Sequence, residues 1–185
     1  MEFKRHDKNS APVASKPVLE EAEKKYGFTP NLFGVMAESP AALKAYTTLS
    51  GILEEDAGLD AQEQQIVMLA TSEFNGCDYC MAAHSTVAER MAKVPPEIIE
   101  ALRDGGLPED ARAKALVRLT RALLEHRGWL PKNEQAAFLE AGYDQQALLE
   151  VITILALKTL SNYTNHLADT PLDEAFQDKA WSKDS

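Results

Sequence analysis

Apolar residues recur every three or four positions along most of the chain, which is the spacing of amphipathic α-helices. The longest clear example runs from Glu109 to His126, and its shared face carries Ala113, Leu116, Val117, Thr120, Leu123 and Leu124. The alternating pattern of β-strands between hairpin turns does not occur. The pattern therefore predicts an all-α protein, a compact bundle of roughly eight helices.

Residues that commonly cap helices mark where several of these helices begin and end. Ser39 followed by Pro40 predicts a helix that ends near Glu55, since proline is favoured in the first helical turn. Gly76 is expected to end another helix, after which the chain starts a new one. Three further helix starts are expected at Asp60, Asn133 and Asp144.

The length of 185 residues suits one domain. We expect residues 16–177 to form this single helical domain. Residues 1–15 contain several charges and Pro12, which predicts a flexible N-terminal arm, and residues 178–185 are expected to form a C-terminal tail.

The charge balance disfavours two classes of partner. Nineteen basic residues against 29 acidic ones give a net charge of −10, which repels nucleic-acid backbones and anionic lipid. The longest strongly apolar run, from Val151 to Leu157, is far shorter than the ~20 residues that cross a bilayer. The charged N-terminus also lacks the apolar stretch of a signal peptide. We therefore expect a cytoplasmic protein that binds neither nucleic acid nor membrane.

The chain has two cysteines, Cys77 and Cys80, which excludes a framework of long-range disulfides. A bridge between them would close a very short loop and would add little stability. In a cytoplasmic protein, this spacing indicates redox or metal chemistry.

Cys77, Cys80 and His84 fall on one face of a helix that begins near Cys77. Cβ atoms three residues apart on a regular helix are about 5–6 Å apart, whereas a relaxed disulfide needs about 3.5–4.5 Å. Cys77 is therefore expected at the helix cap, where Gly76 permits a break. The helix N-terminus favours a thiolate, and His84 is one turn from Cys80, so we interpret Cys80 as the activated nucleophile. Cys77 is then the accessible resolving partner, although the two cysteines could share these roles.

This segment resembles the carboxymuconolactone decarboxylase/AhpD-like superfamily, particularly its alkylhydroperoxidase-like, peroxidase-related branch. The most specific element is the Cys-x-x-Cys-x-x-x-His motif formed by Cys77, Cys80 and His84. Similar stretches also occur at residues 31–36, 59–70 and 156–166, so the resemblance spans roughly residues 16–177.

The resemblance implies an all-helical fold that assembles into dimers, trimers or hexamers. It also implies thiol peroxidase chemistry in which the second cysteine attacks the peroxide. Carried over to this sequence, Cys80 is peroxidatic, Cys77 is resolving and His84 belongs to a proton relay.

One position departs from the pattern of the family. A glutamate that acts as a base in the relay precedes the first cysteine by 12 residues, and here that position is Gln65. An amide can hydrogen-bond to a water or to His84, but it does not usefully accept a proton. Glu73 is a possible substitute base because it is closer to the cysteines and faces roughly the same side. If Glu73 does not substitute, we expect weaker peroxidase activity or a shift toward disulfide exchange.

We therefore expect a thiol-dependent alkyl hydroperoxide reductase that requires no metal, flavin or haem. Its substrate would be a small organic hydroperoxide, and a dithiol or thiol donor would reduce the Cys77–Cys80 disulfide. The substrate pocket is expected to include Tyr79, Asn162, Tyr163 and His166. The long helix that follows Asp144 has more apolar surface than a small bundle buries, which predicts a homo-oligomer.

Other functions are also compatible with the motif. A zinc site would need further ligands from His166, His126 or a carboxylate, because the chain has no second cysteine pair. A redox-sensing module would exchange disulfides without consuming peroxide. Lactone decarboxylation, the reaction that names the superfamily, does not depend on a cysteine pair, so Cys77 and Cys80 argue against it.

Overall fold

The computed structural model describes residues 2–183, and within this range it contains helices and turns but no β-strand. This confirms the predicted all-α class. The elements in chain order are α1 (Lys16–Tyr26), α2 (Asn31–Met36), α3 (Pro40–Asp56), α4 (Ala61–Phe74), α5 (Asp78–Val87), the π-helical turn η1 (Ala88–Ala92), α6 (Pro96–Arg103), α7 (Ala111–Glu125), α8 (Lys132–Glu140), α9 (Gln145–Ala168) and the 3-10 helix η2 (Glu174–Lys179). In the described range, no helix combines the length and apolar character needed to span a membrane.

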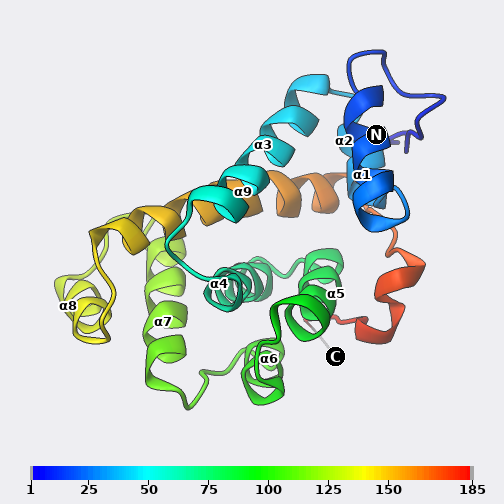
Figure 1. Cartoon of the computed structure of the whole chain (residues 1–185). Helices are drawn as coiled ribbons and strands as arrows, with labels where there is room; N and C mark the ends of the chain where they lie inside the picture. Colours follow the sequence, from blue (N-terminus) through cyan, green and yellow to red (C-terminus); the bar gives the residue numbers. More distant parts are fainter. Residues whose placement is uncertain (1, 184–185) are drawn as a thin grey trace.

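Helix α4 lies at the centre of the molecule. It packs against α5, α6, α7 and α9, which surround it in Figure 1, where α4 is viewed nearly end-on. Every residue from Ile66 to Ser72 is buried, so this helix has a core on all sides rather than the single apolar stripe that its sequence suggests. Its two buried hydroxyl groups are satisfied locally, because Thr71 and Ser72 donate to carbonyl oxygens of the preceding turn.

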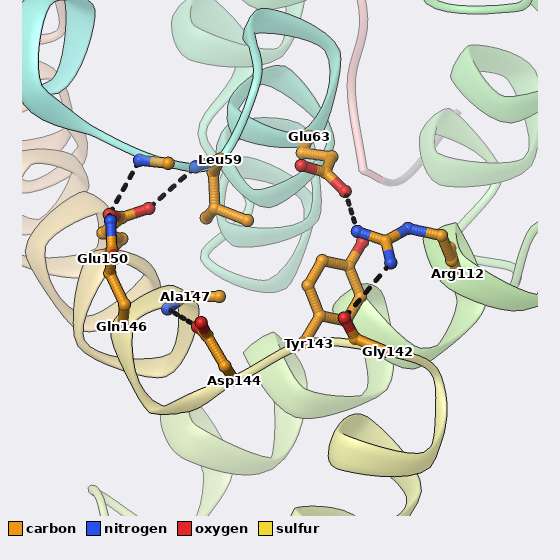
Figure 2. A pocket seen from close by; sticks show the side chains of 10 residues that line it. Leu59, Glu63, Arg112, Gly142, Tyr143, Asp144, Gln146, Ala147 and Glu150 are labelled. Atoms are coloured by element: carbon orange, nitrogen blue, oxygen red, sulfur yellow. Dashed lines mark hydrogen bonds and ion pairs between the residues drawn. The ribbon is translucent and has the colours of Figure 1, made fainter.

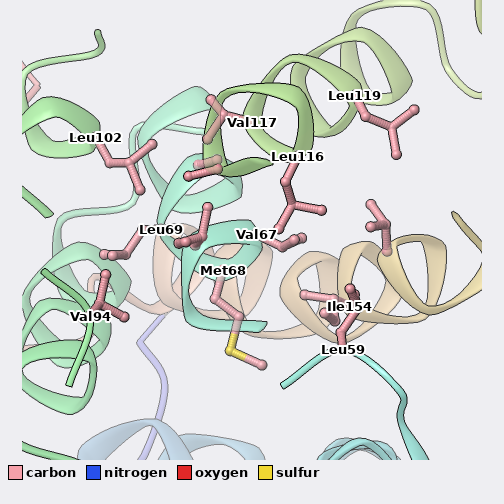
Figure 3. Packing of buried hydrophobic residues seen from close by; sticks show 14 of the residues in the cluster. Leu59, Val67, Met68, Leu69, Val94, Leu102, Leu116, Val117, Leu119 and Ile154 are labelled. Carbon is pink, nitrogen blue, oxygen red and sulfur yellow. The ribbon is translucent and has the colours of Figure 1, made fainter. Parts of the chain in front are cut away.

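The main core joins the central helix to its neighbours. Val67 and Leu69 of α4 are fully buried, as are Leu116 and Val117 of α7 and side chains from α6 and α9. Figure 3 shows these residues directed toward one another from different helices. Burial of this apolar surface fixes the position of α4, and α5 follows α4 in the chain. The core therefore determines where the cysteine motif is placed.

The turn between α3 and α4 is held by the start of α9. The Glu150 carboxylate accepts the backbone N–H groups of Gly58 and Leu59, both at 2.8 Å (Figure 2). Glu63 in the first turn of α4 binds Arg112 of α7 at 2.7 Å. These contacts fix the beginning of α4 independently of its apolar core.

Most predicted helix starts are confirmed, and one is wrong. Asp60, Asp144 and Ser39 each accept a hydrogen bond from a backbone N–H in the first turn of the helix that follows. Helix α8 instead begins at Lys132, after Pro131. The Asn133 amide donates to Glu134 in place of capping the helix.

The N-terminal segment packs against the domain, so the prediction of a flexible arm at residues 1–15 is wrong over the described residues. The backbone N–H of His6 donates to the Gly34 carbonyl at 2.9 Å. The buried imidazole of His6 contacts the Ser10 carbonyl and the Glu38 carboxylate. These polar contacts, together with buried Ala11, offset the entropy lost when the segment is ordered.

The C-terminal tail, predicted as residues 178–185, is also packed over its described part. Arg103 of α6 donates to the carbonyl oxygens of Lys179 and Ala180, and the Trp181 indole donates to the Arg103 carbonyl. This segment lies beside α5 in Figure 1, where it is coloured red. Residues 184 and 185 of the predicted tail lie outside the described residues.

Candidate active site

The two cysteines lie where α4 ends and α5 begins. Gly76 has a φ of +64°, a left-handed conformation that glycine adopts without strain, and it turns the chain between the two helices. Cys77 is the N-cap of α5, with extended backbone angles of φ −97° and ψ 95°. The expected break at the first cysteine is therefore confirmed, and Cys80 follows in the first turn of α5.

Both thiols are free and buried, with 1% of Cys77 and 2% of Cys80 exposed. The Asn165 side-chain amide on α9 donates to the Cys80 sulfur at 3.2 Å and is 3.9 Å from the Cys77 sulfur. The expectation that Cys77 is the accessible cysteine is wrong. The N-cap position places its sulfur under α9 rather than at the surface.

The surroundings shift the pKa values of the two thiols in opposite directions. A hydrogen bond to Cys80, followed by burial and the charge of Cys80, raises the pKa of Cys77, which therefore keeps its proton. Burial opposes ionisation of Cys80, but the hydrogen bond from Cys77, the charge of Lys158 and the polar groups of Ser161 and Asn162 hold its pKa well below the usual value. Cys80 is accordingly the thiolate, and Cys77 donates to it.

His84 is held by Gln65, the position where the resemblance implies a glutamate. Its Nδ1 lies 3.0 Å from the amide oxygen of Gln65, and because this oxygen only accepts, Nδ1 donates. Burial and the charge of Lys158 keep the pKa of His84 well below its usual value, so the ring is neutral. Nε2 is then the unprotonated nitrogen, ready to accept a proton.

A cavity of about 410 Å³ opens onto Cys80 and His84. Its wall is largely apolar and aromatic, and Gln65 also lines it, whereas Cys77 does not. The aromatic residues of this wall are Tyr26, Phe28, Phe33, Tyr46, Tyr79 and Phe176. A cavity of this size and character accommodates a small organic molecule with one end at the Cys80 sulfur.

Of the predicted pocket residues, only Tyr79 lines the cavity. Its hydroxyl donates to the Asp173 carboxylate and accepts from the Leu32 backbone N–H, which ties α5 to the C-terminal segment and α2. Asn162 is buried behind the cysteines, where it accepts from Asn75 at 2.8 Å. The placement of Tyr163 and His166 in the pocket is wrong. Both side chains are exposed and stack on each other, because they lie on the outer face of α9.

Glu73 does not act as a substitute base in this structure. Its carboxylate binds Arg121 of α7 at 3.1 Å and approaches Lys183 at 3.6 Å, and it does not line the cavity. Its position near the end of α4 brings it close to the cysteines in sequence, but the side chain points toward α7. The relay position is therefore occupied by Gln65 alone.

Sequence reasoning missed two residues of α9, Lys158 and Asn165. With Ser161 and Asn162 they form a buried polar row at the i, i+3, i+4 and i+7 spacing of one helix face. This spacing within an otherwise apolar helix was a readable signal that the row faces a polar partner. Among residues 2–183, no three His, Cys, Asp or Glu side chains are grouped as a metal site would require.

Comparisons with known proteins agree with this arrangement. The family model described as Carboxymuconolactone decarboxylase family matches residues 40–122, which include the whole cysteine motif. No curated protein matches the chain significantly.

Several solved structures have a similar fold. One is described as an alkylhydroperoxidase AhpD core, an uncharacterized peroxidase-related protein from Ralstonia eutropha JMP134, with 21% identity over 95% of both chains and a TM-score of 0.83. A peroxidase-related protein from Silicibacter sp. TM1040 has 17% identity over 95% of both chains and a TM-score of 0.79. The debrominase Bmp8 has 20% identity over 96% of this chain and 95% of its own, with a TM-score of 0.79. Residues 40–122 therefore match the carboxymuconolactone decarboxylase family model, and the chain as a whole shares the fold of the AhpD-like, peroxidase-related structures.

Proposed function

We propose that this protein is a thiol-dependent alkyl hydroperoxide reductase in which Cys80 and Cys77 cycle between dithiol and disulfide. The observation that carries the proposal is the placement of Cys80, which lines an organic-sized cavity while the free Cys77 thiol lies beside it and the Asn165 amide reaches both sulfurs. The surroundings lower the pKa of Cys80 and raise that of Cys77. A thiolate is the nucleophile that peroxides require, and the neighbouring thiol can trap the oxidised product.

The first step is attack of the Cys80 thiolate on the terminal oxygen of the hydroperoxide. The oxygen–oxygen bond breaks, the sulfur becomes a sulfenic acid that carries the hydroxyl group, and the alkoxide leaves as alcohol after taking a proton. The Cys77 thiol then attacks the sulfenic sulfur. The sulfur–sulfur bond forms while the Cys77 proton and the hydroxyl group leave as water, so two electrons pass from the dithiol to the peroxide.

His84 moves the proton in this scheme. Its neutral ring lines the cavity next to Cys80, with Nδ1 donating to Gln65. Because Cys80 is already ionised and His84 is neutral in the resting site, Nε2 takes a proton from water and passes it to the departing alkoxide. Gln65 contributes by fixing the tautomer rather than by accepting a proton.

The cavity directs both the substrate and the reductant to Cys80. Its aromatic wall favours a hydroperoxide with an apolar body over hydrogen peroxide. A dithiol donor would enter by the same route and attack the Cys80 sulfur of the disulfide, because Cys77 is 1% exposed and lies off the cavity.

The test is a single-turnover reaction of the reduced protein with cumene hydroperoxide, followed by intact mass and thiol count. Wild type should lose both thiols and about 2 Da, the change expected for one disulfide. Cys77→Ser should stop at the sulfenic acid, which dimedone traps, and Cys80→Ser should not react. These two are the only cysteines in the chain, so each variant serves as the control for the other. Thiols that survive excess peroxide but exchange rapidly with a disulfide reagent would replace the proposal by disulfide exchange.

Reductive dehalogenation is a second candidate, favoured by the aromatic wall next to Cys80. A cysteine-to-alanine variant of the debrominase Bmp8, whose fold this chain shares at 19% identity, has been solved in complex with 2,3,4-tribromopyrrole. Here the dithiol would supply two electrons: the carbon–bromine bond is replaced by carbon–hydrogen, bromide and a proton are released, and the disulfide forms. Release of bromide from a bromopyrrole by reduced wild type, but not by Cys80→Ser, would support this activity.

Assembly into a homo-oligomer is also proposed. Leu149, Ile152 and Leu167 of α9 expose between 44% and 72% of their surface, and such apolar side chains commonly pack against another subunit. Light scattering during size-exclusion chromatography should give a mass of two or more times the 20.4 kDa of a single chain. A monomer at micromolar concentration would contradict it.

A further inference from the structure

Lys158 occupies a position that charged residues rarely have. It is fully buried in α9, with 0% of its surface exposed. Its Nζ has no hydrogen-bond partner among residues 2–183, and none of the ion pairs in that range involves it. A buried ammonium without a partner is strongly destabilising, because the lost hydration is not replaced. The protein keeps this charge inside, so an anion near it is expected.

The geometry of α9 identifies that anion. Lys158 shares its helix face with Ser161, Asn162 and Asn165, and the Asn165 amide reaches the Cys80 sulfur at 3.2 Å. Lys158 lies one turn before Asn162 and two turns before Asn165, on the face of α9 that is turned toward α5. Its charge favours the ionised form of Cys80 and disfavours protonation of His84, so it acts on both groups.

Lys158 lies outside the substrate cavity. The cavity is lined by Cys80, His84 and the neighbouring Leu157, but not by Lys158 or Cys77. An attacking peroxide therefore meets the sulfur from the cavity, and the Lys158 ammonium does not stand in its path. This arrangement allows the cation to stabilise the thiolate without occupying the substrate site.

The cations that line the cavity, Lys25 and Arg90, are paired with Glu54 and Asp178. The other titratable groups around the sulfur do not supply a positive charge. Burial raises the pKa values of Tyr46 on α3 and Tyr79 on α5, so both phenols are neutral. His84 is neutral and Cys77 keeps its proton. Asp173, which accepts a hydrogen bond from Tyr79, is an acidic group and supplies no positive charge. Lys158 is the cation among the groups that affect Cys80.

We propose that Lys158 is the positioning residue that keeps Cys80 ionised, and that it performs by charge what a glutamate–histidine relay would perform by proton transfer. The inference rests on the proposed role of Cys80 as nucleophile. It explains how the site retains a thiolate with Gln65 at the relay position and His84 neutral. It also explains why an unpaired lysine is retained in the core.

The test measures the thiolate itself and needs no peroxide. The ultraviolet thiolate absorbance and the rate of Cys80 alkylation by iodoacetamide are followed against pH in the reduced protein, with fragment-ion mass spectrometry separating Cys80 from Cys77. The variants are Lys158→Met, which keeps an unbranched side chain without the charge, and Lys158→Arg, which keeps the charge. Ile154→Val, on the buried side of α9 one turn earlier, is the matched packing control.

In Lys158→Met, the pKa of Cys80 should rise and its alkylation near neutral pH should fall by about tenfold or more, since one pKa unit is a factor of ten in thiolate. Lys158→Arg should restore most of the rate, and Ile154→Val should leave the pH profile unchanged. A wild-type profile in folded Lys158→Met would overturn the inference, as would a folded Lys158→Arg that fails to restore alkylation. A wild-type protein with a low Cys80 pKa but no reaction with peroxide would refute the peroxidase function alone and leave the role of Lys158 standing.

Discussion

Restoring a carboxylate at the relay position tests how the site controls His84. In Gln65→Glu, a negative charge replaces the amide oxygen that lies 3.0 Å from His84 Nδ1. The side chain keeps its length, so the hydrogen bond can persist. The substitution therefore changes the charge next to the imidazole with little change in shape, and it should favour the imidazolium.

The distance gives the size of the effect. Two unit charges 3.0 Å apart interact by about 1.4 kcal/mol in water and by about 5.5 kcal/mol at an effective dielectric constant of about 20. Gln65 is only partly buried, and the new carboxylate loses some of its own hydration, so the lower value is the safer guide. It corresponds to about a tenfold increase in the ratio of imidazolium to imidazole.

Proton NMR titration of the histidine ring signals measures this ratio. The chain has four histidines, and His84→Gln assigns the signal of His84. Gln62→Glu is the matched control, because it adds the same charge to an exposed position of α4 where the amide contacts only the Lys93 carbonyl. The pKa of His84 should rise in Gln65→Glu and stay at the wild-type value in Gln62→Glu. A wild-type titration of His84 in folded Gln65→Glu would refute the assigned contact and the neutral state derived from it.

Three further substitutions test the scaffold around the site, each by urea unfolding. Glu150→Gln should lower the free energy of unfolding by about 1.5–3 kcal/mol, because one of two charge-assisted bonds to the α3–α4 turn is replaced by a facing donor. Burial raises the pKa of Glu150, but its hydrogen bonds outweigh burial and lower it overall. The stabilising contribution of Glu150 is therefore present above its unfolded-state pKa and is lost as the pH falls through the folded-state pKa. A free energy of unfolding that falls with acid in Glu150→Gln as it does in wild type would contradict this. Tyr79→Phe removes the hydrogen bond to Asp173 and should lower the free energy of unfolding by about 1.5–3 kcal/mol. Because this bond holds the C-terminal segment, hydrogen exchange should show faster exchange of residues 171–181 in the variant. Leu116→Ala, in the core between α4 and α7, should cost about 2–5 kcal/mol, and a loss below 1 kcal/mol would show that this contact is not close-packed.

The amino-acid sequence by itself determined the class of fold and the local geometry of the motif. Apolar spacing predicted the helices, and the capping residues Ser39, Asp60 and Asp144 marked their starts correctly. Helix geometry also placed Cys77 at an N-cap. These features depend on interactions within a few residues of the chain, and such interactions can be read from residue types and their spacing.

Only the tertiary structure decided which groups from distant segments meet at the sulfurs. Spacing shows which residues share a face of α9, but not whether that face is turned inward, and so His166 was expected in the pocket while Asn165 was missed. Glu73 looked available until α7 brought Arg121 to it. A lysine is usually exposed, so the burial of Lys158 depends on the packing of α9 against α5 and α4 rather than on any local pattern. Electrostatics acts through space between elements, and for this reason the charge that favours the Cys80 thiolate appears only when the helices are assembled.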